Sequence, residues 1–278
     1  MINRSMKSHT ISIPHGVYDI DINSYHSSEG ISRSAIMEFN KTPFHFWDKY
    51  INRNSKSKNE ETSSMKIGSL IHEYVLEKKT FFDKYVISEK KDRRTKEGKQ
   101  YFELIESNGK KVLDETEFEQ IKIMDQSLMS NRQIHGLITQ GKYEQSIYWT
   151  DPDTGLLCKC RPDIWQNNFI VDIKTSSNAS YREFQRSMHM YGYHLQCAMI
   201  SEAFKHVFNI TMNDFIFVVI ENKYPFAVAI YQFDIESLNK SIDIFKSKLK
   251  EIKKCYEDKE WPSYKTQIMY LPSYALGE

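Results

Sequence analysis

The sequence predicts a mixed α/β (α+β) fold in which a central mixed β-sheet is flanked by helices. Three observations lead to this prediction. Apolar residues recur with helical spacing over Met65–Lys78 and again from Ser180 to about Ala203. Between residues 143 and 174 the spacing changes to two, which is typical of strands. The predicted strands there are Tyr143–Thr150, Leu156–Pro162 and Phe169–Lys174. Two further strand-like runs follow the second helix: Phe215–Ile220 and Phe226–Tyr231. The predicted order is therefore helix, three strands, helix, two strands.

Composition is that of a globular protein and excludes an overall basic nucleic-acid-binding chain. Hydrophobic residues make up 40% and charged residues 27% of the 278 residues, which allows a large core. Lys and Arg number 38 against 37 Asp and Glu, so a surface that binds nucleic acid must be a local patch. The sequence has no run of 18 apolar residues, and its first residues lack the apolar stretch of a signal peptide. We therefore expect no membrane contact.

Cysteine usage indicates a reducing compartment. The four cysteines are Cys158, Cys160, Cys197 and Cys255. Cys158 and Cys160 would share one face of a strand, which is a poor geometry for a mutual disulfide. No C-x2-C pair is present, which argues against zinc or an iron–sulfur cluster. We expect a cytoplasmic protein.

Residues 1–64 are predicted to form an N-terminal extension of irregular and helical segments. Ser32 can cap a helix, and Pro43 ends that helix or redirects the chain. The predicted elements are a short strand at Val17–Ile22, a helix over Arg33–Asn40, an aromatic-rich helix over Pro43–Tyr50 and a polar loop over Asn52–Ser64. We interpret the aromatic residues as core packing, with a base-stacking platform as the alternative.

A strong amphipathic helix is predicted from Met65 to about Lys78, capped by Ser63 or Ser64. His72 lies off the centre of its apolar stripe, and such a histidine is more often a rim residue than a ligand. Gly68 lies one turn earlier on the same side. Since glycine inside a helix costs about 1 kcal/mol relative to alanine, we expect another group to approach closely there.

The densest basic run of the sequence follows, over Lys90–Lys99. Such a run is usually a solvated loop and helix start, and its alternative is an element that contacts DNA phosphates. The candidate DNA-binding residues there are Arg93, Arg94, Lys96 and Lys99. Residues Tyr101–Leu137 are predicted to form one or two helices, so that a helical insertion spans about 90–137.

The most informative stretch runs from Arg161-Pro162-Asp163 to Lys174. Asp172 and Lys174 alternate with one apolar residue and therefore project from the same strand face. The intervening Gln166-Asn167-Asn168 predicts a turn, and a hairpin there brings Asp163 beside Asp172. Two adjacent carboxylates repel each other unless a cation lies between them. The pattern predicts an Mg²⁺ or Mn²⁺ site, and its alternative is a cross-sheet ion pair.

Two helices are predicted around the last strands. Ser180-Tyr181-Arg182-Glu183 matches a capping box and starts one long helix that carries Tyr193 and Gln196 beside its apolar stripe. Asp234 or Ser237 caps a final helix that reaches about Cys255. The sequence contains no internal repeat.

The sequence resembles the PD-(D/E)XK nuclease superfamily, and within it the phage-type RecE exonucleases (exodeoxyribonuclease VIII-like). Arg161-Pro162-Asp163 matches the PD part, and Asp172-Ile173-Lys174 matches the (D/E)XK part. The closer likeness runs from about Tyr25 to Tyr264. It is carried by Gly68-Ser69-Leu70-Ile71-His72, Asp92–Lys99, Cys158–Asp163, Asp172–Thr175, Tyr193–Ala198 and Trp261-Pro262-Ser263-Tyr264.

The resemblance implies a restriction-endonuclease-like core over residues 65–264, with 265–278 as a tail and the whole chain as one structural unit. It implies that Asp163, Asp172 and Lys174 are catalytic, supported by Tyr193 and Gln196. The implied metal ligands are His72, Asp163, Asp172 and the carbonyl of Ile173, around two Mg²⁺ or Mn²⁺ ions. Arg161 and Thr175 are further DNA-binding candidates.

The resemblance also implies an activity and its partners. It predicts an exonuclease that digests linear double-stranded DNA from 5′ ends and leaves 3′ single strands for recombination. A ring-shaped homo-oligomer, a single-strand annealing partner and a phage or prophage origin in a bacterial host belong to the same expectation. Two alternatives remain: a structure-specific or restriction-type endonuclease, and a non-catalytic DNA-binding protein.

Overall fold

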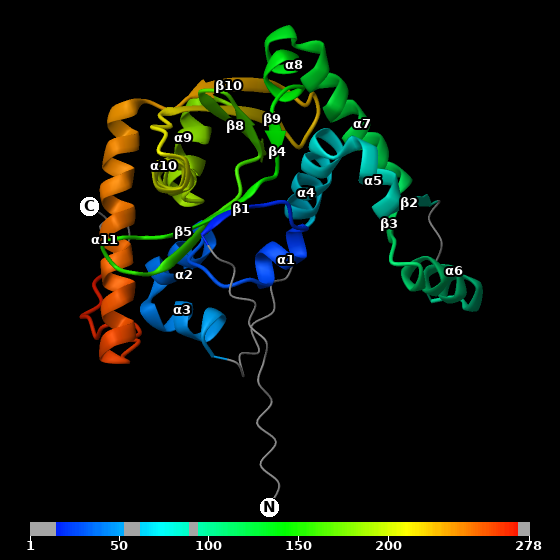
Figure 1. Cartoon of the computed structure of the whole chain (residues 1–278). Coiled ribbons are helices and arrows are strands. Elements are labelled where there is room, and N and C mark those ends of the chain that lie inside the picture. Colours follow the sequence, from blue (N-terminus) through cyan, green and yellow to red (C-terminus); the bar gives the residue numbers. More distant parts are fainter. Residues whose placement is uncertain (1–14, 53–61, 89–93, 272–278) are drawn as a thin grey trace, which may run out of the picture.

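The computed structural model describes residues 15–52, 62–88 and 94–271. At its centre lies a mixed five-stranded sheet in the order β10-β9-β8-β7-β4 (Figure 1). Its strands are β4 (Lys142–Tyr143), β7 (Ile164–Gln166), β8 (Phe169–Ser176), β9 (Asp214–Glu221) and β10 (Val228–Gln232). β8 and β9 are parallel and the other neighbours antiparallel, which agrees with the predicted mixed sheet.

Helices cover both faces of this sheet (Figure 1). One face packs against α9 (Tyr181–Met190), α10 (Tyr193–Phe208) and α11 (Ile235–Asp258). The other packs against α4 (Ser63–Leu76), α7 (Glu115–Ser130) and α8 (Arg132–Ile138). Because side chains alternate along a strand, β9 sends Phe217 and Val219 into the first core and Val218 and Ile220 into the second.

A second, three-stranded sheet contains β1 (Gly16–Tyr18), β5 (Ser146–Thr150) and β6 (Leu157–Cys160) in the order β1-β5-β6. The prediction of one strand over Tyr143–Thr150 is therefore wrong. Glu144 has a φ of 52°, and this left-handed conformation bends the chain out of one sheet and into the other. The next predicted strand, Leu156–Pro162, is β6, which ends at Cys160 and belongs to the second sheet. Asp163 directly precedes a separate strand, β7.

The N-terminal elements are close to the prediction. α1 (Ile22–Ser27) replaces the end of the strand expected at Val17–Ile22, because the Asp21 side chain caps a helix there. α2 (Arg33–Lys41) and α3 (Pro43–Tyr50) are confirmed, and the Ser32 hydroxyl accepts a hydrogen bond from the Ala35 amide. α3 also anchors the C-terminal segment, since the Trp261 ring stacks on Phe46 at 5.5 Å.

Residues 78–88 and 94–114 form an arm that extends on the side of the molecule away from α11 (Figure 1). Beyond α4 it contains α5 (Lys78–Lys84), β2 (Tyr85–Ser88), α6 (Lys96–Ser107) and β3 (Lys111–Asp114). The prediction of one or two helices over Tyr101–Leu137 is wrong, because β3 pairs in parallel with β2 and three helices occupy this region. Thr62, and neither Ser63 nor Ser64, caps α4. Most of the predicted loop at Asn52–Ser64 lies outside the described residues.

The helix predicted from Ser180 to Ala203 is two helices. Gly192, with a φ of 67°, separates α9 from α10, and a Cβ at this position would lie 2.5 Å from the Met37 sulfur. Ser180 makes no side-chain capping bond, so the predicted capping box does not form. The last helix is capped by Asp234 as predicted. None of the helices in residues 15–52, 62–88 and 94–271 has the length and hydropathy that crossing a membrane requires. All four cysteines are free.

Candidate metal centre

Asp163 and Asp172 lie at the point where β7 and β8 separate. Asp163 directly precedes β7, and the antiparallel register Ile164↔Val171 continues to place it opposite Asp172. Asp163 is 6% exposed and Asp172 5%. Asp172 also forms an ion pair with Lys174, as expected for side chains on one strand face. The hairpin therefore brings two buried carboxylates and one ammonium together.

His72 reaches the two carboxylates from α4, which packs on the face of the sheet that is opposite to α10. Its Nε2 lies 2.8 Å from Asp163 Oδ2, so the histidine is not the rim residue that its position on the helix suggests. The close approach predicted at Gly68 is also found, because a Cβ there would lie 2.9 Å from the Thr175 hydroxyl. Gly68 thus lets α4 lie against the end of β8, which brings His72 within reach of the carboxylates.

Gln196 and Tyr193 approach from α10, on the other face. Gln196 Nε2 donates a hydrogen bond to Asp172 Oδ1 at 2.8 Å. The Tyr193 ring centre lies 4.9 Å from Lys174 Nζ and 5.7 Å from the Arg33 guanidinium carbon. The Tyr193 ring therefore lies close to two cations, which holds it beside the acidic pair.

The charges of this site perturb one another strongly. Burial raises the pKa of Asp172, and the adjacent Asp163 charge raises it further, to about 6. Burial opposes ionisation of Asp163 as well, but the charges of His72 and Lys174 outweigh it and bring the pKa of Asp163 well below its usual range. Burial lowers the pKa of His72, yet Asp163 and Glu144 raise it to about 9. The pKa of Lys174 is raised by Asp172 and Asp163 against the effect of burial. At neutral pH, positive charge therefore balances the carboxylates.

The donor atoms fit a divalent metal ion. Asp172 Oδ2 is buried and contacts the Lys174 ammonium. His72, Glu144 and Asp163 offer atoms that all lie within 4.8 Å of one another. Carboxylate oxygens with one imidazole nitrogen suit Mg²⁺ or Mn²⁺. The amide of Ile173 donates to Asp163, and its carbonyl, which shares that side of the strand, faces the same region.

Glu144 is the site residue that the sequence did not reveal. Its Oε1 lies 3.1 Å from His72 Nδ1, and its Oε2 accepts a hydrogen bond from Arg161 Nε. The surrounding Tyr-Glu-Gln-Ser residues match no motif. Its left-handed backbone distinguishes Glu144 in the structure, but a sequence does not show backbone conformation. The one available signal was the position of an acid inside a strand-like run, where an unpaired charge is costly.

Arg161 requires a correction. It was a DNA-binding candidate, but its side chain is only 8% exposed. Besides Glu144, its guanidinium donates to the Ile20 carbonyl at 2.8 Å and the Ser146 hydroxyl at 2.6 Å. Its Nε and Nη1 groups are therefore engaged inside the protein, where they hold Glu144 and the N-terminal segment beside the site.

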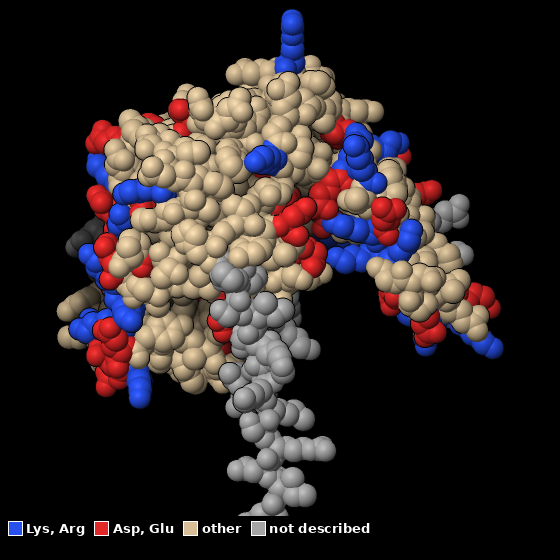
Figure 2. Space-filling view, in the orientation of Figure 1, with Lys and Arg blue, Asp and Glu red and all other residues tan. Residues whose placement is uncertain are grey.

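The described basic candidates of residues 94–99 lie away from the metal centre. Arg93 lies outside the described residues. Arg94, Lys96 and Lys99 are exposed at the start of α6, at the outer end of the arm (Figure 1). Figure 2 shows basic and acidic side chains mixed over α4, α5 and α7, where the ion pairs Lys66–Glu117 and Lys78–Asp125 lie. Thr175 is next to Lys174 but contacts α4.

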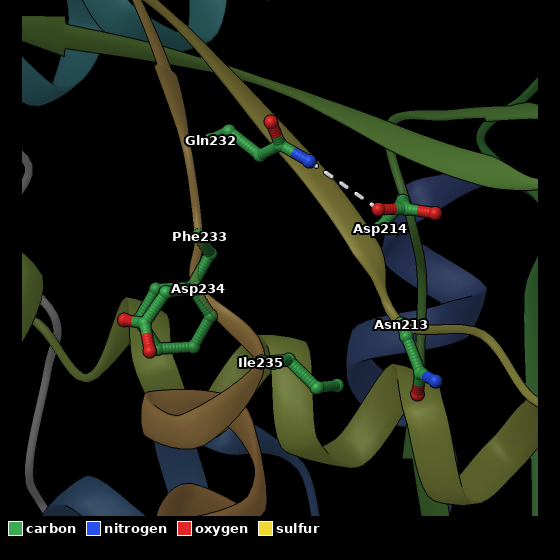
Figure 3. Close-up of a pocket in the computed structure, with 6 residues that line it drawn as sticks. All are labelled: Asn213, Asp214, Gln232, Phe233, Asp234 and Ile235. Carbon is green, nitrogen blue, oxygen red and sulfur yellow. Dashed lines mark hydrogen bonds between the residues drawn. The ribbon is translucent and has the colours of Figure 1, made fainter.

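A pocket of about 450 Å³ lies elsewhere, at the start of β9 and the end of β10 (Figure 3). Its lining residues are Asn213, Asp214, Gln232, Phe233, Asp234 and Ile235. Gln232 donates to Asp214 at 3.3 Å, and Asp234 caps α11. Three of its polar side chains, those of Asp214, Gln232 and Asp234, thus take part in contacts within the fold. It contains none of the residues around Asp172, which pairs further along β9 with Phe217.

This combination of a mixed sheet, paired acids, a lysine and supporting residues from the two flanking helices defines a PD-(D/E)XK-type domain. The chain belongs to the family described as "PDDEXK-like domain of unknown function (DUF3799)", whose model matches residues 32–273. No curated protein matches the sequence.

Solved structures share the fold. The crystal structure of a "Putative exonuclease" from Eubacterium rectale is similar with a TM-score of 0.63 and 13% sequence identity, over 93% of this chain and 98% of that one. The crystal structure of SSO0001 has a TM-score of 0.27 and 15% identity, over 65% of this chain and 86% of that one, and carries no argument. The family and the fold together support a nuclease.

Proposed function

We propose that this protein is a metal-dependent deoxyribonuclease that hydrolyses phosphodiester bonds. The observation that carries the proposal is the convergence of His72, Asp163, Asp172 and Lys174 from α4 and two strands, with Gln196 bonded to Asp172. Buried acids that repel each other are costly for stability, and a divalent cation would relieve that repulsion.

His72, Asp163, Asp172 and the carbonyl of Ile173 would hold the metal, and one or two Mg²⁺ or Mn²⁺ ions fit this number of donors. When bound, the metal supplies positive charge for the phosphoryl oxygens and lowers the pKa of water. Lys174 stays protonated at neutral pH because two carboxylates raise its pKa, so it orients water or neutralises phosphate charge. The new bond joins the water oxygen to phosphorus, and the bond to the 3′-oxygen breaks.

The favoured substrate is linear double-stranded DNA, degraded from 5′ ends by an exonuclease that leaves 3′ single strands. The likeness to RecE-type exonucleases over most of the chain supports this choice, and so does the description of the Eubacterium rectale protein. A ring-shaped homo-oligomer, a single-strand annealing protein as partner and a cytoplasmic site of action in a bacterial host, with phage or prophage origin, belong to the same proposal and rest on that likeness.

An endonuclease on the same fold is the second candidate, because the exposed basic start of α6 is far from the metal centre and offers a separate contact for duplex DNA. A non-catalytic DNA-binding protein is the third, although the complete set of acids and lysine argues against it. An exonuclease requires a DNA end and an endonuclease does not, so cleavage of circular DNA distinguishes these two. Metal-dependent cleavage of any DNA excludes a non-catalytic protein.

The test compares linear and closed circular duplex DNA with Mg²⁺, Mn²⁺ or EDTA. We expect the wild type to degrade linear DNA only when metal is present and to spare the circle. Asp172→Ala and Lys174→Ala are each expected to lose about 100-fold or more in rate, whereas Asp153→Ala, at an exposed turn, should be unaffected. Equal cleavage of circles would favour the endonuclease. The proposal would be refuted if the wild type were inactive with both metals. It would also be refuted if Asp172→Ala and Lys174→Ala kept full activity.

A further inference from the structure

The metal centre lies between two corners at which the chain crosses from one sheet to the other. Glu144 follows β4 of the five-stranded sheet and precedes β5 of the three-stranded sheet. Arg161–Asp163 makes the return crossing, from β6 to β7. The Glu144 amide donates to the Asp163 carbonyl at 3.0 Å, so the two corners are joined through the backbone beside the metal-binding side chains.

Glu144 is held in an unusual conformation. Its φ of 52° lies in the left-handed region that residues other than glycine rarely adopt. Such backbone persists where surrounding contacts hold it in place, often at functional sites. Here both ends of the side chain are fixed, with Oε1 3.1 Å from His72 Nδ1 and Oε2 bound to Arg161. The carboxylate is only 13% exposed.

This geometry separates the role of Glu144 from that of Asp163. The two nitrogens of an imidazole point in different directions, and His72 directs Nε2 at Asp163 and Nδ1 at Glu144. An ion bound at Nε2 would lie on the Asp163 side of the ring, and the Glu144 oxygen faces the other nitrogen. The other Glu144 oxygen is occupied by Arg161. Glu144 therefore lies behind the histidine as seen from the metal-binding side.

We infer that Glu144 is a positioning residue that accepts a hydrogen bond from the Nδ1–H group of His72 and thereby directs Nε2 toward a divalent ion. A histidine that binds metal commonly donates its other N–H to a carboxylate, which fixes the ring orientation and raises the basicity of the ligand. Arg161 in turn fixes Glu144, and Ile20 and Ser146 fix Arg161. This inference rests on the proposed metal-dependent function but assigns a role within it that neither sequence motif contains.

The test uses the full chain and Glu144→Gln. His72 and Arg161 contact different oxygens of Glu144. A glutamine side chain keeps only one of these oxygens, so either His72 or Arg161 would face its NH2 group, which is a donor. We expect the dissociation constant for Mn²⁺, measured by electron paramagnetic resonance, to rise about 10- to 100-fold. In the metal-free wild type, a slowly exchanging Nδ1 proton of His72 should be visible in ¹H–¹⁵N spectra, and in Glu144→Gln it should shift or disappear.

Glu202→Gln is the matched control. Glu202 is also a buried acid that contacts a histidine, His206 at 3.3 Å, and a cation, Lys246 at 3.0 Å. It lies about 9 Å further along α10 than Gln196, and its replacement should leave Mn²⁺ affinity unchanged. Glu144→Gly, which suits a positive φ, is a second variant in case glutamine prevents folding.

The outcomes separate this inference from the proposed function. If Mn²⁺ affinity and the His72 signal are unchanged in a folded Glu144 variant, the positioning role is wrong while the nuclease proposal stands. If the wild type binds no Mn²⁺ and cleaves no DNA, the proposed function fails, and the His72 proton in the metal-free protein still decides whether Glu144 holds the ring.

Discussion

The backbone amide of Ile173 donates a hydrogen bond to the side chain of Asp163, with N and Oδ2 2.8 Å apart. The same oxygen lies 2.8 Å from His72 Nε2. One buried carboxylate oxygen thus joins β8 to α4, elements that reach the site from separate parts of the sequence. Asp163 therefore has a structural role in the metal-free protein in addition to its proposed role as a ligand.

Asp163→Ala should destabilise the metal-free protein. The substitution leaves the buried Ile173 amide without an acceptor and His72 without its nearest carboxylate, and a buried unpaired donor costs about 1–3 kcal/mol. We expect the free energy of unfolding, measured by urea denaturation with EDTA, to fall by about this amount. Asp153→Ala, at an exposed turn position, is the control. Equal stability of Asp163→Ala and wild type would show that these contacts contribute nothing.

The stability of the metal-free protein should depend on the charge of His72. The pKa of His72 is about 9 in the folded protein and 6.5 in its unperturbed state, because Asp163 and Glu144 face the ring from two sides and outweigh burial and the charge of Lys174. A raised pKa stabilises the folded state fully below pH 6.5, and this contribution is lost as pH rises through 9. The advantage of wild type over His72→Gln in free energy of unfolding, measured with EDTA, should therefore shrink between pH 6.5 and 10. A constant difference across that range would contradict the assignment.

The part of the site that local pattern determines could be predicted from the sequence. Alternation along β8 places Asp172 and Lys174 on one face, and the turn at Gln166–Asn168 brings Asp163 opposite Asp172. Both relations need only a strand and a hairpin. His72 needed more, because its helix position alone indicated a rim residue and only the family resemblance indicated a ligand.

The rest depends on contacts between distant segments or on backbone conformations that residue types do not specify. The left-handed backbone at Glu144 divides one apparent strand between two sheets. The position of Arg161 in the motif suggested a contact with DNA. In the structure its guanidinium instead donates to groups within the protein, one of which, the Ile20 carbonyl, is distant in sequence. The break at Gly192 has a signal in the sequence, a glycine within a helical pattern, but the apolar spacing continues across it and predicts one helix.

Gly68→Ala should impair the site more than its effect on helix propensity suggests. Alanine normally favours a helix over glycine by about 1 kcal/mol. Here its Cβ would lie 2.9 Å from the Thr175 hydroxyl, so α4 or the end of β8 must shift, and His72 and Lys174 with them. We expect lower nuclease activity in Gly68→Ala and recovery in the double variant Gly68→Ala/Thr175→Ala, which removes the hydroxyl. A double-mutant cycle on rate and on unfolding measures the coupling, and additive effects would show that the contact is unimportant.

Gln196→Leu should lower the rate of cleavage with little change in DNA affinity. Gln196 donates to Asp172 Oδ1, and this bond orients the carboxylate that is proposed to bind metal. Loss of such a supporting bond typically costs 10- to 100-fold in metal affinity or activity. Steady-state kinetics on linear duplex DNA, repeated over a range of Mg²⁺ concentrations, should show a lower kcat that excess metal partly restores. A changed KM for DNA with unchanged kcat would instead assign Gln196 to DNA binding.

The ring and the hydroxyl of Tyr193 can be tested separately by substitution. The ring centre lies 4.9 Å from Lys174 Nζ, a cation–π distance at which the ring helps to hold the ammonium beside Asp172. We therefore expect Tyr193→Phe, which keeps the ring, to retain most activity, and Tyr193→Leu to lose considerably more. Thermal denaturation of both variants controls for folding, since the ring also packs near Phe184 at 6.1 Å. If Tyr193→Phe is as inactive as Tyr193→Leu, the hydroxyl itself contacts the DNA or the attacking water, and the role of the ring is secondary.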